Sequence, residues 1–134
     1  METLENKICL DTDFLVNFLR NNKNEAEFVK ENEIGKELAT TFINIFELFY
    51  GAYKSSNREE NIKLVKLLLN RISLLNLSLE SSEKAGEISA RLEKEGNPLE
   101  FRDILVGTTA LVNGYSIKTN NVKHFNKIEG LNVI

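Results

Sequence analysis

Short apolar segments alternate with segments of helical periodicity along most of the chain, and this alternation is the feature that most restricts its fold. In such a chain each helical segment connects two parallel strands, so the strands form one sheet with helices on both faces. We therefore predict a three-layer α/β domain with a mostly parallel, five-stranded sheet. The segments expected to form its strands are residues 8–10, 38–45, 72–77, 115–119 and 131–134.

The segments between these strands predict the helices. Pro98 suits the first turn of a helix and Gly114 the position just after its end, so one helix is expected to begin near residue 97 and to stop at residue 113. The other segments with apolar residues at helical spacing are residues 14–19, 47–53, 62–72 and 85–92.

Length and composition indicate a single globular domain over residues 1–134. Hydrophobic residues make up 42% of the chain and charged residues 28%, close to the globular average, so we expect it to fold unaided. The start of the sequence, residues 1–6, is polar, and no apolar stretch approaches the length of a membrane span. A single cysteine allows no internal disulfide. These features predict a cytoplasmic protein that does not bind membranes.

The scarce residue types exclude several kinds of chemistry. Cys9 and His124 are the chain's only cysteine and histidine, too few for an ordinary zinc site. A Ser-His-Asp or Cys-His-Asn enzyme would have to use His124, and no nucleophile signature accompanies it. The sequence also has no glycine-rich phosphate-binding loop. Carboxylates are the reactive groups that remain.

Polar side chains follow several of the predicted strands. Asp11 comes directly after the first strand, Glu47 just beyond the second, and Asn120 and Asn121 after the fourth. Asp103 lies in the first turns of the helix expected from residue 97. Because ligands of parallel α/β sheets bind at the carboxyl ends of the strands, we expect three acids and an amide to meet there.

Carboxylates that share a small site repel one another unless a cation intervenes. Oxygen ligands of this kind suit Mg²⁺ or Mn²⁺, and such ions promote attack on phosphodiesters. The sequence therefore predicts metal-dependent phosphodiester hydrolysis. The same repulsion predicts that loss of both Asp11 and Asp103 raises the thermal stability of the protein in EDTA.

Four segments resemble, in order and spacing, the motifs of the PIN-domain ribonucleases, and in particular those of the VapC-type toxins of prokaryotic toxin–antitoxin pairs. The resemblance spans residues 8–134. It rests on residues 8–15, similar to the family's hydrophobic-Leu-Asp-Thr start, residues 46–52, similar to its Glu-Leu-x-x-Gly motif, residues 103–111, similar to Asp-x-x-Ile-Ala-x-x-Ala-Leu, and residues 118–131, similar to Thr-x-Asn-x-x-x-Phe followed by Gly-Leu.

The resemblance implies a PIN-like fold and a magnesium- or manganese-dependent endoribonuclease that inhibits translation by cutting RNA. It further implies a homodimer and a small cognate antitoxin that covers the active site. Asp11, Glu47 and Asp103 would carry over as the acidic metal ligands. Asn121 stands at the fourth catalytic position, which in the family is often Asp and can be Asn.

Several residues have more than one interpretation. His124 occupies a nearby position that is often acidic in the family, and Glu100, three residues before Asp103, is another candidate for the fourth group. Each of the two glutamates also fits a structural role, because Asn44 and Glu47, like Asn97 and Glu100, have the spacing of a helix capping box.

Two alternative functions remain open. The absence of a fourth carboxylate favours a catalytically weakened PIN-like module that binds RNA or protein. The pair Asp11-x-Asp13 also resembles the nucleophile motif of haloacid-dehalogenase-type phosphatases, with Asp11 as nucleophile and Asp13 as acid and base. Against this, residues 119–121 lack the later acidic motif of those enzymes, and Asp13, like Thr12, is better suited to capping a helix than to catalysis.

The charge balance gives a final constraint. A net charge of −3 argues against binding nucleic acid by bulk charge alone. Metal ions at the acidic site would reverse its local sign, and residues 113–134 carry three lysines against one acid. Without metal, the same pocket is anionic and suits a basic antitoxin.

Overall fold

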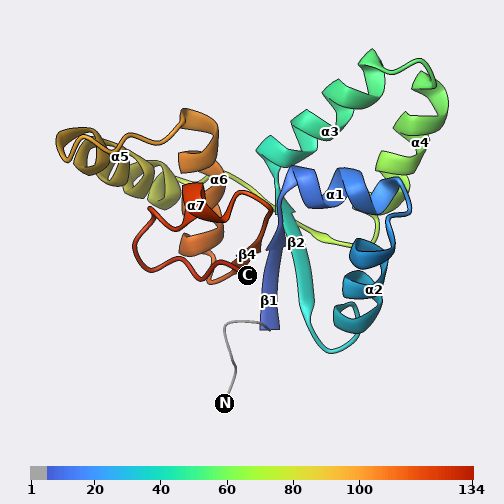
Figure 1. The fold of residues 1–134 in the computed structure, drawn as a ribbon, viewed down its shortest axis with the longest axis horizontal. Helices are drawn as coiled ribbons and strands as arrows, with labels where there is room; N and C mark the ends of the chain where they lie inside the picture. Colours follow the sequence, from blue (N-terminus) through green and yellow to red (C-terminus); the bar gives the residue numbers. More distant parts are fainter. Residues whose placement is uncertain (1–5) are drawn as a thin grey trace.

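The computed structural model describes residues 6–134, so residues 1–5, and the expectation based on the polar start of the chain, lie outside the described residues. Four strands form one parallel sheet in the order β3-β2-β1-β4 (Figure 1). The predicted three-layer α/β domain is confirmed. The strands are β1 (Lys7–Leu10), β2 (Glu37–Thr41), β3 (Ser73–Leu75) and β4 (Ser116–Lys118).

Helices cover both faces of the sheet, as Figure 1 shows. Ile8 and Leu10 of β1 pack into one core, and Cys9 between them packs into the other, because successive strand residues point to opposite faces. The first face is covered by α1 (Thr12–Leu19), α2 (Lys23–Asn32), α3 (Phe42–Lys54) and α4 (Arg58–Leu69), and the second by α5 (Leu79–Lys94), α6 (Phe101–Val112) and α7 (Val122–Phe125).

The strand order reverses between β1 and β4. The chain adds β2 and then β3 on one side of β1, and α5 and α6 then return it across the second face to β4, which pairs with the other side of β1. In the register of this last pair, Leu10 lies beside Lys118. Ligands of doubly wound sheets bind beyond the carboxyl ends of the strands at such a reversal. The residues that follow Leu10 and Lys118 therefore lie where such ligands bind.

Two details of the predicted sheet are wrong. Residues 131–134 form no fifth strand, although Val133 makes an isolated parallel bridge with Ile117 along the edge of β4. The second strand ends at Thr41, four residues early. There the hydroxyl of Thr41 accepts the backbone N–H of Asn44, and the Asn44 side chain accepts the backbone N–H of Thr41, which starts α3 at Phe42.

This cap settles the structural role proposed for Glu47. Asn44 is the third helical residue of α3 and closes the capping box with Thr41, so Glu47 takes no part in capping. The other box is also absent, because α6 begins at Phe101 rather than near residue 97, and Glu100 stands at its N-cap without a side-chain capping bond. No helix within residues 6–134 combines the length and the apolar character needed to cross a membrane.

Candidate active site at the carboxyl ends of β1 and β4

Asp11 is the fully buried N-cap of α1 and directly follows β1. One of its carboxylate oxygens accepts hydrogen bonds from the backbone N–H of Thr12 at 2.9 Å and from the side-chain amide of Asn44 at 3.0 Å. The other accepts the hydroxyl of Thr119, just beyond β4, at 2.8 Å. Donors from α1, α3 and the end of β4 thus fix both oxygens in place.

Glu47 and Asp103 approach Asp11 from different helices. Glu47 lies one and a half turns inside α3, half-buried, and its carboxylate accepts the hydroxyl of Thr12 at 2.5 Å. Asp103 lies in the first turn of α6 and is buried, and its Oδ2 is 3.0 Å from Nδ1 of His124. The convergence of three acids predicted from the sequence is therefore present.

Arg102 lies among these three acids. Its Nη2 is 2.7 Å from Asp11 Oδ1, its Nε is 3.0 Å from Glu47 Oε2, and its Nη1 is 2.8 Å from Asp103 Oδ1. Burial lowers the pKa of the guanidinium, but its hydrogen bonds to Glu47 and Asp11 outweigh this effect and raise the pKa above the usual arginine range. In this state an arginine of the chain itself offsets the repulsion among the carboxylates.

Arg102 was not predicted from the sequence as part of the site. The only signal was that Arg102 directly precedes the motif aspartate, Asp103. Basic residues are also common on helix surfaces, so this position alone does not indicate a role. Nothing in the sequence indicates that its guanidinium reaches back to Asp11, 91 residues earlier.

The three acids line an open hollow of about 360 Å³, and the remaining candidates line it too. Asn121 is exposed at its rim, and its backbone N–H donates to the hydroxyl of Thr119. His124, half-exposed, contacts Asp103, a partner that the sequence did not reveal. Besides Asn121 and His124, the hollow is lined by Asp11, Thr12, Asp13, Glu47, Glu100, Arg102 and Asp103.

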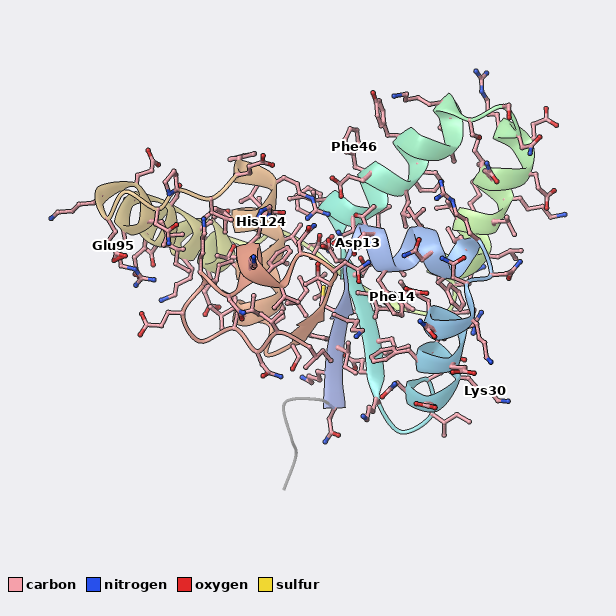
Figure 2. The ribbon with its side chains drawn as sticks, viewed as in Figure 1. Asp13, Phe14, Lys30, Phe46, Glu95 and His124 are labelled. Carbon is pink, nitrogen blue, oxygen red and sulfur yellow. The ribbon has the colours of Figure 1, made fainter. Side chains whose placement is uncertain are left out.

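Asp13 has a structural role in this arrangement, although the expectation that Thr12 or Asp13 caps the helix is wrong, because Asp11 is the N-cap of α1. Its two oxygens accept the backbone N–H groups of Phe14 and Asn120, at 2.6 and 3.1 Å, and so connect α1 to the loop after β4. Burial, and to a lesser degree the charge of Asp11, raises the pKa of Asp13. Figure 2 shows Asp13 at the junction of the two helical layers, with His124 on the side of α7. Asn120 contributes its backbone to this contact, so Asn121 is the better candidate for the site.

The donor set suits a hard divalent cation. Three carboxylates from three elements face one solvent-accessible hollow, and such oxygens are the ligands that Mg²⁺ and Mn²⁺ prefer. In the arrangement seen, however, no group of three or more His, Cys, Asp or Glu side chains within residues 6–134 could hold a metal ion. Arg102 bridges the acids instead. The chemistry of the carboxylates fits a divalent cation, whereas in this structure their oxygens are bridged by the guanidinium.

Comparison with known proteins gives consistent matches. Residues 8–131 match the PIN domain family. Among curated proteins, the chain is 31% identical over 123 residues to Ribonuclease VapC1 of Haemophilus influenzae, covering 91% of this chain and 92% of that protein. It is 29% identical over 129 residues to the tRNA(fMet)-specific endonuclease VapC of Salmonella typhimurium, covering 95% and 96%.

Solved structures agree with these sequence matches. The fold superposes with a TM-score of 0.87 on a chain of the DNA-bound VapBC complex of Salmonella typhimurium, with 27% identity and coverage of 96% of each chain. A chain of VapBC-1 from nontypeable Haemophilus influenzae gives a TM-score of 0.84 with 29% identity. In both comparisons the similarity covers nearly all of this chain and nearly all of the solved chain.

Proposed function

The chain belongs to the PIN domain family, as its four motifs predicted, and from this premise we propose that it is a metal-dependent endoribonuclease toxin of the VapC type. The observation that carries the proposal is the meeting of Asp11, Glu47 and Asp103 around one hollow at the reversal of strand order. The relatives named as ribonucleases, at about 30% identity over most of both chains, support the same activity.

In this proposal Asp11, Glu47 and Asp103 hold Mg²⁺ or Mn²⁺. Such an ion supplies positive charge to the reacting phosphate and makes water more acidic. The chain's other residues position the ligands: the hydroxyl of Thr119 orients Asp11, and His124 orients Asp103 through its Nδ1 contact. Ligands held in this way need little reorganisation when the substrate binds.

Asn121 completes the proposed catalytic set. Its amide stands at the exposed rim of the hollow, where it can donate to a phosphate oxygen or accept from the attacking water. An amide contributes no negative charge, so this site holds fewer charges than one with four carboxylates. His124 and Glu100 are less suited to the fourth position, because His124 is engaged with Asp103, and Glu100, although it lines the hollow, is exposed to solvent.

We also propose partners and a setting for this activity. The substrate is RNA, and a small cognate antitoxin neutralises the toxin, because solved structures similar to this chain are those of VapBC complexes. The protein acts in the cytoplasm as a homodimer of PIN domains.

A second candidate function is a weakened PIN-like module that binds RNA or protein without cutting. Two observations favour it: an amide at the fourth position, and the Arg102 guanidinium among the carboxylates. The phosphatase alternative has less support, because both oxygens of Asp13 are occupied by backbone N–H groups and its carboxyl is poorly placed to transfer protons.

Brief expression in bacterial cells tests the proposed toxin function. We expect the wild type to arrest growth and to generate new RNA ends at defined positions, mapped by sequencing the fragments. Asp103→Asn should do neither at equal protein level. The matched control is Glu129→Gln, which removes an exposed acid. New ends that are identical for the wild type and Asp103→Asn would contradict nuclease activity at this site and favour the binding module.

A further inference from the structure

The guanidinium of Arg102 holds all three acids of the proposed metal site at once. Each of its three nitrogens is engaged: Nε with both oxygens of Glu47, Nη1 with Asp103, and Nη2 with Asp11 and Glu47. Hydrogen bonds between charged groups are the stronger class, and the planar guanidinium can serve several acceptors simultaneously. One arginine thus occupies the coordination positions that the proposed function assigns to a metal ion.

We propose that Arg102 is a resident counter-cation of this site, and that its guanidinium must leave Asp11, Glu47 and Asp103 before these carboxylates can hold a divalent cation. This inference rests on the proposed function, since it concerns the same metal site. It makes metal loading a competition between an internal and an external cation.

The carboxylates have other donors that keep them in place when Arg102 leaves. Asp11 retains Asn44 and Thr119, which bind it from α3 and from the end of β4. Glu47 keeps the hydroxyl of Thr12, and Asp103 keeps its contact with His124. The site would therefore remain assembled, with oxygens freed by the departing guanidinium.

The position of Arg102 allows it to move without unfolding the domain. It is the second residue of α6, and its side chain remains 25% exposed beside the open hollow. The two residues before it, Glu100 and Phe101, are exposed, so the side of Arg102 toward them opens to solvent. A change of side-chain rotamers is enough to withdraw the guanidinium.

The charge balance favours replacement by a divalent ion. One guanidinium faces three carboxylates, so the cluster stays net negative and attracts a further cation. A compact ion with two charges neutralises more of that excess than an arginine. Removal of the arginine's charge should therefore strengthen metal binding rather than weaken it.

Direct titration of Mn²⁺ into the purified, metal-free full-length chain tests this competition. Calorimetry, or electron paramagnetic resonance of free Mn²⁺, would compare the wild type with Arg102→Met, which keeps an unbranched side chain and removes the charge. We expect Arg102→Met to bind Mn²⁺ about tenfold more tightly, equivalent to about 1.4 kcal/mol. Arg102→Lys, a second variant that keeps the charge but loses the fork, should lie between the two.

The matched control is Arg20→Met. Arg20 is exposed and lines a second pocket, to which Glu47 also contributes, and within residues 6–134 it forms no ion pair with an acid. Its removal changes the net charge equally, so we expect its Mn²⁺ affinity to stay within about twofold of wild type, a change of less than about 0.5 kcal/mol.

The possible outcomes separate the two proposals. Equal or weaker Mn²⁺ binding by Arg102→Met, with binding to the wild type intact, would overturn the competition and leave the metal site standing. A gain of the same size in Arg20→Met would also overturn it, because net charge alone would then explain the effect. Absence of Mn²⁺ binding in wild type and both Arg102 variants would overturn the metal site, and with it this inference.

Discussion

Replacing Asp11 with asparagine should destabilise the metal-free protein. The sequence alone led to the opposite sign for the loss of these acids, because clustered carboxylates repel one another. The structure reverses that expectation, because Arg102 pairs with Asp11 at 2.7 Å and Asn44 and Thr119 donate to its oxygens. An asparagine has one acceptor oxygen and places an NH₂ group where Asp11 accepts from a donor.

The magnitude follows from the bonds lost. Breaking a buried ion pair on one side costs about 3–5 kcal/mol when the remaining charge is left alone. Here Arg102 keeps Glu47 and Asp103, so the cost falls toward that of charge-assisted hydrogen bonds, and we expect about 2–3 kcal/mol in total. At about 3 °C per kcal/mol for a domain of this size, Tm should fall by about 6–9 °C.

Urea and thermal unfolding in EDTA measure this difference directly. Circular dichroism of the wild type and Asp11→Asn would give the midpoints, with Glu129→Gln as the control for loss of an exposed acid. We expect the control to stay within about 0.5 kcal/mol of wild type. A midpoint for Asp11→Asn that is equal to or higher than that of wild type would refute the reasoning, because repulsion among the acids would then outweigh the Arg102 ion pairs.

Two further predictions concern the surroundings of the site. Because burial raises the folded-state pKa of Asp13, its ionisation opposes folding, so the stability of wild type relative to Asp13→Asn should fall as the pH rises above the ordinary aspartate pKa. The same variant should still cleave RNA, and near-total loss of turnover would restore the phosphatase interpretation. A β-carbon at Gly107 would overlap Cδ1 of Ile128, so Gly107→Ala should cost about 1–3 kcal/mol. Ile128→Val removes that atom, so the double mutant Gly107→Ala/Ile128→Val should lose less stability in urea unfolding than the sum of the two single mutants. Additive losses of stability would contradict the overlap.

The sequence predicted the layers of the fold because the central strands are short, apolar and buried on both faces. Where prediction failed, the local signal was ambiguous. Residues 42–45 contain two isoleucines and resemble a strand, but the Thr41–Asn44 capping box starts a helix there. Helix α2 was missed because most of its residues are charged or polar, and only Val29 and Asn32 are buried.

The candidate site shows the same division between local and distant information. Asp11 and Asp103 could be found because each stands at the end of a strand or the start of a helix, where parallel topology brings side chains together. Glu47 was identified by its family motif, since the strand that it was expected to follow ends six residues earlier, at Thr41. Arg102 could not be found, because its contact with Asp11 depends on where the fold places the start of α6 relative to the end of β1. Sequence spacing carries little information about such contacts.

Cleavage of labelled RNA by the purified protein tests the central claim most directly. The claim is that Asp11, Glu47 and Asp103 form a metal-dependent ribonuclease site. Wild type, Asp11→Asn and Asp103→Asn would be incubated with varied RNAs in Mg²⁺, Mn²⁺ or EDTA. We predict cleavage by the wild type with a divalent cation, none in EDTA, and a loss of at least about a hundredfold in either variant, or about 2.7 kcal/mol of transition-state stabilisation. Wild-type cleavage no faster than that of the two variants, with either metal and across all RNAs tested, would contradict the claim.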